Sequence, residues 1–440
     1  MNPNWSQLRQ NLQSTSEEVQ AETILNLRKI VNVTHPPIIN LVESEMIPLI
    51  VELLDSSNVQ IQSDATWILI NVSFESSTYS ISIFNAGGIP KLLQLLKSTN
   101  IQVANNSAWV LANLCGDNQD FRDRIIEARA IPIVAECLQS PNINLRFLQS
   151  LVWFALNTVR SSHDNLDSVS LLIHPILNQF TKTDDRKVLV DACWFFEFIM
   201  TRNRFIPSEI ISDLLNHLNV FMNNNSNFYV LQASLRVISS VSMRRHYRYS
   251  EQIINSNILP TLIRFITDEN DVVSRLACLC CRQFSSWRFY GGSGNIQSHL
   301  FNHDLIPKLT SLFESDDRLW RSKREGIWLL KNIINIDYNH RLEITSNETL
   351  FNAVLNTLNS QNVELVKEVL KFFQHLNYVT LSNEVEFLEI LRSCDFQKHL
   401  EDILDHVSDE IHSLAYELLR QVFPEAVPNS LCNYFASPEE

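Results

Sequence analysis

A tryptophan followed four residues later by an asparagine recurs in the first half of this 440-residue chain. The pairs are Trp67/Asn71, Trp109/Asn113 and Trp153/Asn157. Residues four apart share one face of a helix, so each pair presents an indole beside a carboxamide. Core packing would account for the tryptophans. It accounts poorly for asparagine, which is a mediocre helix former and is costly to bury without partners. We therefore expect the pairs to line an exposed face.

Such a face has the chemistry to bind an extended basic peptide. A carboxamide offers an acceptor and two donors, so it can bond both the N–H and the C=O of a peptide main chain. Parallel indoles form slots for long aliphatic side chains, and a cation above an indole gains roughly 0.5–2 kcal/mol. Two carboxylates could make such slots select Lys or Arg: Asp117 after Trp109, and Asp191 one turn before Trp194. Each could equally be a helix cap or a solvated charge.

The spacing of these residues indicates a repeat. Trp67, Trp109, Trp153 and Trp194 are separated by 42, 44 and 41 residues. Prolines keep the same period: Pro48, Pro90, Pro132 and Pro175 recur every 42 to 43 residues, and Pro260 follows after 85. Two markers that share one period are typical of a helical solenoid, in which each unit buries its apolar face against its neighbours. Binding in such arrays uses the concave surface.

One repeat shows the elements that position the pairs. A short helix is predicted at Ser80–Asn85, and Pro90 suits the first turn of a second helix. A longer helix is predicted from about Gln102 to Cys115. Three helices in about 42 residues follow the armadillo plan. The sequence therefore predicts an all-α fold, a right-handed armadillo-repeat superhelical solenoid of about ten three-helix repeats.

The expected boundaries are a short polar tail at 1–12, the repeat domain at 13–424 and a C-terminal tail at 425–440. The net charge of −14 disfavours nucleic acid and anionic membranes as partners. Long apolar runs and secretory signals are lacking, and the cysteines occupy helix-core positions, so we expect a reducing compartment, the cytoplasm or nucleus. Neither a catalytic motif nor a metal or cofactor motif is present, so we do not expect an enzyme, a cofactor or a metal site.

Three stretches of the chain resemble the importin α family, adaptors that recognise basic nuclear localisation signals. They are PPIINLVESEMIPLIVELL (36–54), ANLCGDNQDFRDRIIEARAIP (112–132) and DEIHSLAYELLRQVF (409–423). The resemblance implies a major signal-binding site in repeats two to four, formed by the three Trp/Asn pairs. It places Asp117 where the family's aspartate meets the key lysine of the signal. The fifth repeat retains Asp191 and Trp194, with Phe198 in place of the usual tyrosine.

The family's minor site, in repeats six to eight, looks eroded. The sixth repeat has Arg236 where a tryptophan is expected. The eighth keeps Trp328 and Asn332, with Glu325 one turn before the tryptophan. The resemblance therefore implies a preference for signals with a single basic cluster, or a changed second-site preference.

The resemblance also implies partners other than the cargo. Family members carry a basic importin-β-binding segment before the repeats, whereas residues 1–20 hold Arg9 as their one basic residue. Recruitment of importin β therefore stays open. The tenth repeat (about 400–424) would meet the nuclear export receptor. Two functions follow: a nuclear import adaptor for Lys/Arg-rich signals, or an armadillo scaffold or cargo-sequestering protein that does not recruit importin β.

Overall fold

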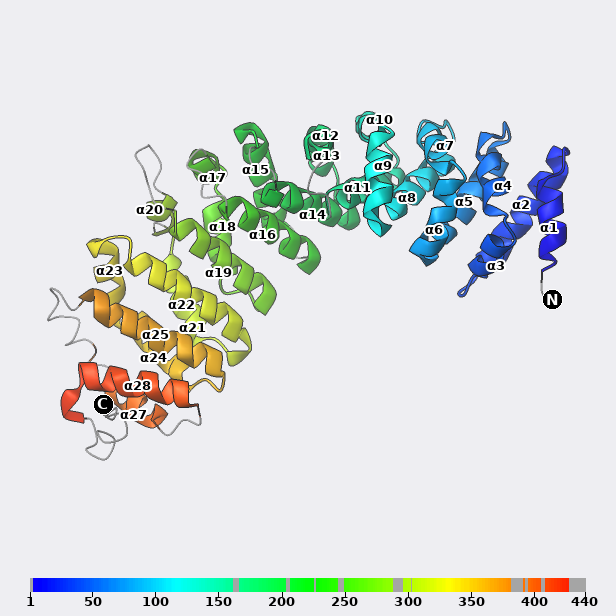
Figure 1. The fold of residues 1–440 in the computed structure, drawn as a ribbon. Coiled ribbons are helices and arrows are strands. Elements are labelled where there is room, and N and C mark those ends of the chain that lie inside the picture. Colours follow the sequence, from blue (N-terminus) through cyan, green and yellow to red (C-terminus); the bar gives the residue numbers. More distant parts are fainter. Residues whose placement is uncertain are drawn as a thin grey trace, which may run out of the picture. The chain divides into compact units, whose positions relative to one another are not determined.

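In the computed structural model every described element is a helix, and no strand occurs among the described residues. The structure describes residues 3–160, 166–202, 206–224, 227–243, 249–287, 296–301, 303–380, 391, 395–404 and 408–426. The chain divides into two compact units, Met1–Phe205 and Ile206–Glu440 (Figure 1). Each unit is described by itself.

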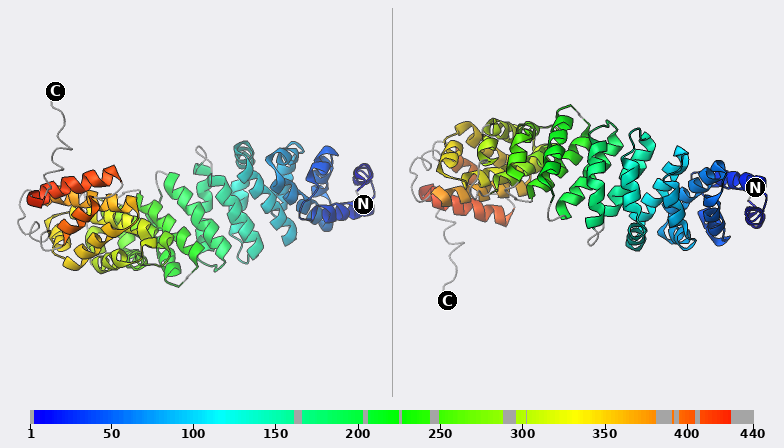
Figure 2. Two further views of the ribbon diagram at one scale, coloured as in Figure 1. Left: turned by 90° about the horizontal axis from the view of Figure 1, so that it is seen from below. Right: turned by 90° about the horizontal axis from the view of Figure 1, so that it is seen from above.

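The N-terminal unit holds the first five repeats. Its helices are α1 (Trp5–Leu12), α2 (Glu17–Val31), α3 (Ile38–Glu43), α4 (Ile47–Glu52), α5 (Val59–Glu75), α6 (Ser77–Asn85), α7 (Gly88–Leu95), α8 (Ile101–Asp117), α9 (Gln119–Glu127), α10 (Ala130–Leu138), α11 (Leu145–Arg160), α12 (Leu166–Val169), α13 (Ile173–Phe180) and α14 (Arg186–Arg202). The last and longest helix of each repeat packs on the next, so that α2, α5, α8, α11 and α14 form a continuous row (Figure 2).

The C-terminal unit holds repeats six to ten. Its helices are α15 (Ser208–Asn224), α16 (Phe228–Met243), α17 (Ser250–Asn255), α18 (Ile258–Phe265), α19 (Asp271–Ser285), α20 (Ile296–Phe301), α21 (Leu305–Glu314), α22 (Trp320–Ile334), α23 (Tyr338–Thr345), α24 (Glu348–Asn356), α25 (Val363–Thr380), α27 (Phe396–Ile403) and α28 (Asp409–Val422). Here α16, α19, α22, α25 and α28 form the row of long helices.

The sixth repeat departs from the expected three-helix plan. A single helix of 17 residues, α15, stands where repeats two to five and seven to nine have two short ones. The reason is local: residues 208–224 contain neither proline nor glycine, and buried apolar residues recur every three to four positions from Ile210 to Met222. The helical pattern therefore continues without a break, and the prediction of three helices in every repeat is wrong here.

The turns of the third repeat explain why its helices begin where they do. Gly87 has φ of 73°, a left-handed conformation that favours glycine, and it leads directly into α7. Pro90 lies in the first turn of α7, where its missing N–H is harmless. Asn100 caps α8, and its side chain accepts hydrogen bonds from the backbone N–H groups of Gln102 and Val103. The predicted boundaries of this repeat are therefore confirmed to within a few residues.

The same cap recurs along the chain. Asparagines accept hydrogen bonds from the first turns of α5, α8, α11, α16, α19 and α25; they are Asn58, Asn100, Asn144, Asn227, Asn270 and Asn362. This cap fixes the residue at which the long helix starts. It therefore also fixes how far along that helix the Trp/Asn positions lie.

We expect Asn100→Ala to lower the free energy of unfolding by about 1 kcal/mol, because two N–H groups of α8 lose their acceptor. Urea unfolding followed by circular dichroism measures this. Asn100→Asp, which keeps an acceptor, is the matched control and should be close to wild type. Equal losses in both variants would contradict a capping role.

The first twelve residues require a correction. The expected polar tail at 1–12 contains helix α1, whose residues Leu8 and Leu12 are buried, and α1 packs on α2. A short helix with an apolar face is difficult to recognise in a polar stretch of sequence, because two leucines are enough to form its buried side. Of the expected C-terminal tail, residues 427–440 lie outside the described residues.

Candidate peptide-binding groove

The Trp/Asn pairs lie on the row of long helices in the N-terminal unit. Trp67 and Asn71 are on α5, the second pair is on α8 and the third is on α11. Asp117 is the last residue of α8. Asp191 and Trp194 are on α14. All nine predicted major-site residues therefore come from four successive, mutually packed helices.

The indoles are neither buried in the core nor fully exposed. Trp109 is 39% exposed, and Trp67, Trp153 and Trp194 are half-buried. Phe74, seven residues after Trp67 and so on a similar face of α5, is 78% exposed. Aromatic surface at this level gives a peptide side chain a flat apolar contact.

Two of the three carboxamides are open to a ligand in part. Asn71 donates through Nδ2 to the carbonyl oxygen of Trp67 at 2.9 Å, within its own helix. Asn113 donates through Nδ2 to Ser73 Oγ at 3.1 Å, which ties α8 to α5. Both residues are half-buried. Each amide nitrogen is thus held in place by a hydrogen bond within the protein.

Asn157 differs, and the prediction that it faces an open groove is wrong. It is 1% exposed and donates through Nδ2 to the carbonyl oxygen of Ala112 at 2.9 Å. The cause lies on α8, where Gly116 has no side chain: a Cβ atom there would come within 2.9 Å of Asn157 Nδ2. The glycine lets α8 cover the carboxamide. Asn157 therefore ties α11 to α8.

Trp67 is covered by the chain itself. The guanidinium carbon of Arg28, on α2, lies 5.5 Å from the indole centroid. Arg28 Nη1 also pairs with Asp64 Oδ1 at 2.5 Å, and the Asp64 side chain is buried. The first slot thus already holds a cation. Within the described part of the chain, no such cation covers Trp109 or Trp153.

Asp191 is a carboxylate without an internal partner at one oxygen. Its Oδ2 is buried and makes no hydrogen bond. Burial raises the pKa of Asp191 to about 6, and nearby Lys187 and Asp185 act in opposite directions on it. An ionised but desolvated carboxylate gains strongly from a ligand cation. Asp117 is exposed at the end of α8, so it can meet a cation with little rearrangement.

The predicted minor site lies in the C-terminal unit, and its indole is covered from within. The guanidinium carbons of Arg282 and Arg324 each lie 5.0 Å from a Trp328 ring centroid. Trp328 Nε1 donates to Glu368 Oε2 at 2.6 Å. Glu325 is buried and lies 3.0 Å from Arg282 Nε. The chain's own arginines thus hold the place that a ligand cation would need.

The remaining minor-site residues are similarly engaged. Asn332 donates through Nδ2 to the Arg282 carbonyl oxygen at 3.0 Å and to Ser285 Oγ at 3.2 Å. Arg236 is half-buried on α16. Burial raises the pKa of Glu325, opposed mainly by Arg282. These contacts give the expected erosion of this site a physical basis.

The covering arginines were missed, although the sequence holds a signal for them. Arg28 and Arg282 each stand three residues after the position that aligns with the repeat tryptophan, at Leu25 and Leu279. Each covers the tryptophan of the following repeat. Repeats two, three and four have apolar residues at that position, namely Ile70, Ala112 and Leu156. Among Trp67, Trp109, Trp153 and Trp328, an arginine at this position of the preceding repeat is found where the indole is covered.

We expect Trp328→Ala to change the affinity for a Lys-rich peptide less than about twofold, because the faces of Trp328 already meet internal cations. Trp109→Ala is the comparison and should lower the affinity for the same peptide about tenfold or more. Fluorescence anisotropy measures both, after circular dichroism has verified the fold. Equal losses would contradict the assignment of open and covered slots.

Other site types find no support in the residues that the structure describes. No group of three or more His, Cys, Asp or Glu side chains there could hold a metal ion. Nor is any described helix long and apolar enough to cross a bilayer. Cys278, Cys280 and Cys281 are fully buried, and burial raises their thiol pKa values, as expected for core residues.

The chain is similar in sequence to one repeat family and in structure to engineered proteins. The armadillo/beta-catenin-like repeat family matches residues 34–74 and 80–116, which hold the first two Trp/Asn pairs. No protein with a curated description matches the chain. A crystal structure of an engineered protein from the Northeast Structural Genomics Consortium has a TM-score of 0.74 at 18% identity, over 96% of this chain and 99% of that one.

A second engineered protein from the same consortium has a TM-score of 0.48 at 20% identity, over 55% of this chain and 97% of its own. At such low identity the first likeness concerns the fold alone, and it agrees with the rows of packed helices and the repeat match. The chain is an all-α solenoid of the armadillo type, and its residues 34–74 and 80–116 match the armadillo repeat.

Proposed function

We propose that this chain binds Lys/Arg-rich extended segments of other proteins along α5, α8, α11 and α14, and that it acts as a nuclear import adaptor for basic localisation signals. The observation that carries the proposal is the open stretch around Trp109 and Trp153. There, indoles that no cation of the described residues covers lie in one row of helices with exposed Asp117 and half-buried Asp191.

The binding mode follows from these groups. The aliphatic part of a ligand lysine packs along Trp109, and its ammonium group meets Asp117 at the end of α8. A second basic side chain reaches Asp191 beside Trp194. The side-chain oxygens of Asn71 and Asn113 accept main-chain N–H groups of the peptide, since their Nδ2 atoms are bonded to the protein. Main-chain bonds hold the strand, and the carboxylates select the charge.

The covered slots limit the length of signal that fits. Arg28 fills the Trp67 slot, and arginines flank Trp328 in the C-terminal unit. A peptide with one basic cluster can therefore use the open slots in full. A second cluster would have to displace internal arginines and break the pair with buried Glu325. This favours single-cluster signals.

The test is a titration with two fluorescein-labelled peptides of equal length, one Lys-rich and one in which Ser replaces each Lys. We expect tight binding of the first alone, and an affinity that falls as salt rises, because partly exposed ion pairs are screened over about 8 Å at physiological ionic strength. Equal binding of both peptides, or an affinity independent of salt, would remove the basic-peptide function.

A second function keeps the groove and changes its role: an armadillo scaffold or cargo-sequestering protein that binds basic segments without recruiting importin β. A pull-down of importin β and of the nuclear export receptor with the full chain separates the two. Recovery of importin β supports the adaptor; its absence alongside intact peptide binding supports the scaffold.

A further inference from the structure

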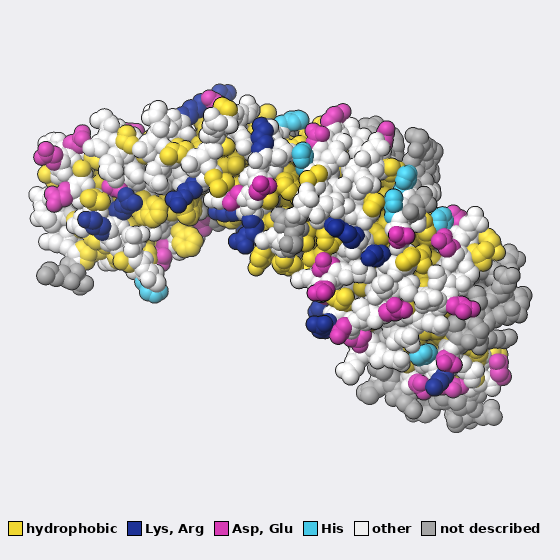
Figure 3. Space-filling model, turned by 180° about the vertical axis from the view of Figure 1, so that it is seen from behind, with side chains coloured by type: hydrophobic (Ala, Val, Ile, Leu, Met, Phe, Trp, Pro, Cys, Tyr) yellow, Lys and Arg dark blue, Asp and Glu magenta, His cyan; other side chains and the backbone are white. Residues whose placement is uncertain are grey.

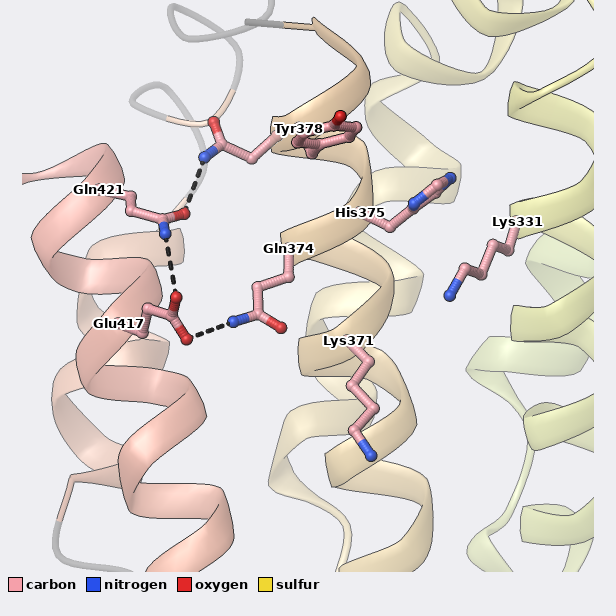
Figure 4. Close-up of a pocket in the computed structure, with 8 residues that line it drawn as sticks. Lys331, Lys371, Gln374, His375, Tyr378, Glu417 and Gln421 are labelled. Carbon is pink, nitrogen blue, oxygen red and sulfur yellow. Dashed lines mark hydrogen bonds between the residues drawn. The ribbon is translucent and has the colours of Figure 1, made fainter.

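A polar hollow in the C-terminal unit lies on its last three long helices. It has a volume of about 770 Å³ and opens between α22, α25 and α28 (Figure 4). The lining residues are Lys331, Lys371, Gln374, His375, Asn377, Tyr378, Glu417 and Gln421. The hollow therefore carries two lysines and a histidine together with three amide side chains.

Two residues that line the hollow occupy positions that are equivalent to the Trp/Asn positions of other repeats. Lys371 and His375 follow Trp328 and Asn332 by one repeat, 43 residues later in each case. The positions that offer an indole and a carboxamide in repeats two, three, four and eight thus offer an ammonium group and an imidazole in the ninth. In the ninth repeat, a lysine and a histidine therefore replace the indole and carboxamide side chains of this row.

The lysines are available to a ligand. Lys331 is half-buried, and no carboxylate of the described residues forms an ion pair with it. Its amino group points toward α25 in Figure 4. Lys371 Nζ lies 3.4 Å from Glu410 Oε1, but Glu410 is held more closely by Lys367, at 2.9 Å. One lysine is thus unpaired and the other shares a carboxylate that is already engaged.

His375 lines the same hollow as a neutral polar group. Burial lowers its pKa first, and Lys331 and Arg341 lower it further. Its Nε2 lies 3.1 Å from the accepting oxygen Asn335 Oδ1, so Nε2 carries the ring proton. Nδ1 of the neutral imidazole can therefore accept a hydrogen bond from a peptide N–H group.

Glu417 places one negative charge in the hollow against the two lysines, and neutral amides bond its oxygens. Gln374 donates to its Oε2 at 2.7 Å and Gln421 to its Oε1 at 3.3 Å, while Asn377 donates to Gln421 Oε1 at 3.1 Å (Figure 4). This chain of amides crosses from α25 to α28. Tyr378 beside it is 76% exposed and offers an aromatic surface.

We propose that this hollow binds an acidic peptide segment of a partner protein, with Asp or Glu carboxylates on Lys331 and Lys371, and main-chain groups beside Gln374 and Gln421. The amides and the exposed tyrosine suit a peptide main chain and its side chains. A nucleic acid fits less well, because a phosphate backbone needs a continuous basic stripe. Figure 3 shows acidic and basic side chains interspersed on the face drawn there.

The site is independent of the basic-peptide groove, and its test uses the full chain. The probe is a short fluorescein-labelled peptide of alternating Glu and Ala, titrated at about 0.15 M salt. The variants are the double change Lys331→Glu with Lys371→Glu, and the control Lys398→Glu. Lys398 is exposed on α27, outside the hollow, so it carries the same kind of charge reversal without touching the site.

We expect the wild type and Lys398→Glu to bind the acidic peptide alike, and the double variant to bind it at least about tenfold more weakly. A Lys-rich peptide should bind the double variant as it binds the wild type, which separates this site from the major groove. Equal binding of the acidic peptide by the double variant and the control would overturn the proposal. So would tighter binding of a single-stranded DNA oligonucleotide than of the peptide, if the double variant lost it.

Discussion

A chain carrying Trp109→Ala together with Asp117→Lys is expected to bind a Lys-rich peptide roughly 100-fold more weakly than the wild type. The indole contributes about 0.5–2 kcal/mol as a cation–π partner, and a charge-assisted hydrogen bond contributes about 1.5–3 kcal/mol. Their sum, about 2–5 kcal/mol, corresponds to roughly 1.4 to 3.6 powers of ten in affinity, at about 1.4 kcal/mol for each. Reversing the charge of Asp117 adds repulsion. Fluorescence anisotropy at fixed salt measures the change.

A matched control separates the groove from the overall charge. Glu127 is exposed on α9, outside the row of long helices, and Glu127→Lys makes the same charge change there. Combined with Trp328→Ala, it reproduces the net charge and the Trp→Ala change of the test variant, with both changes outside the open slots. This control should bind the peptide nearly as the wild type does. Similar weakening in test and control would mean that net charge, and not the groove, controls affinity.

Asp191→Asn is expected to act in opposite directions on stability and on binding. The pKa of Asp191 is raised from 3.8 to about 6 in the folded chain, so the ionised form is disfavoured by folding. The penalty is absent below pH 3.8, grows between pH 3.8 and 6, and is complete above pH 6. At pH 7 the asparagine variant should therefore be more stable by up to about 3 kcal/mol, since one pKa unit corresponds to 1.36 kcal/mol.

The same change removes the carboxylate that a ligand cation needs. We expect Asp191→Asn to lower the affinity for the Lys-rich peptide about fivefold to tenfold, and to raise the midpoint of thermal unfolding. In the wild type, the affinity should decline as pH falls through about 6, because Asp191 takes up a proton there, and the variant should lack this step. Thermal denaturation and anisotropy at a series of pH values measure both. Loss of stability in the variant would contradict a functional role for the unpartnered oxygen.

A residue that lowers stability while it improves binding is typical of a functional position. We expect Asp191 to fit this description, whereas buried Asp64 does not, since Arg28 and Gln60 both contact its carboxylate. The two aspartates lie on equivalent long helices of the same unit. The Asp191→Asn variant described above tests whether this difference in surroundings reflects a difference in role.

Periodicity alone determined much of this protein. The recurrence of Trp and Pro every 41 to 44 residues required a repeat, and the helix boundaries around Pro90 and Asn100 followed from local turn and cap chemistry. Such signals depend on neighbours within a few residues, so a sequence carries them directly. The placement of the Trp/Asn pairs on one row of packed helices follows from the same repeat.

Only the tertiary structure decided which positions of that row remain open. Asn157 is buried because Gly116 on the preceding long helix leaves room for it, and Trp67 is covered because Arg28 reaches across from α2. These contacts join residues about one repeat apart, and their outcome depends on how closely two helices approach. The sequence determined the period and the residue types on each helix; the packing distance between helices decided which side chains can still meet a ligand.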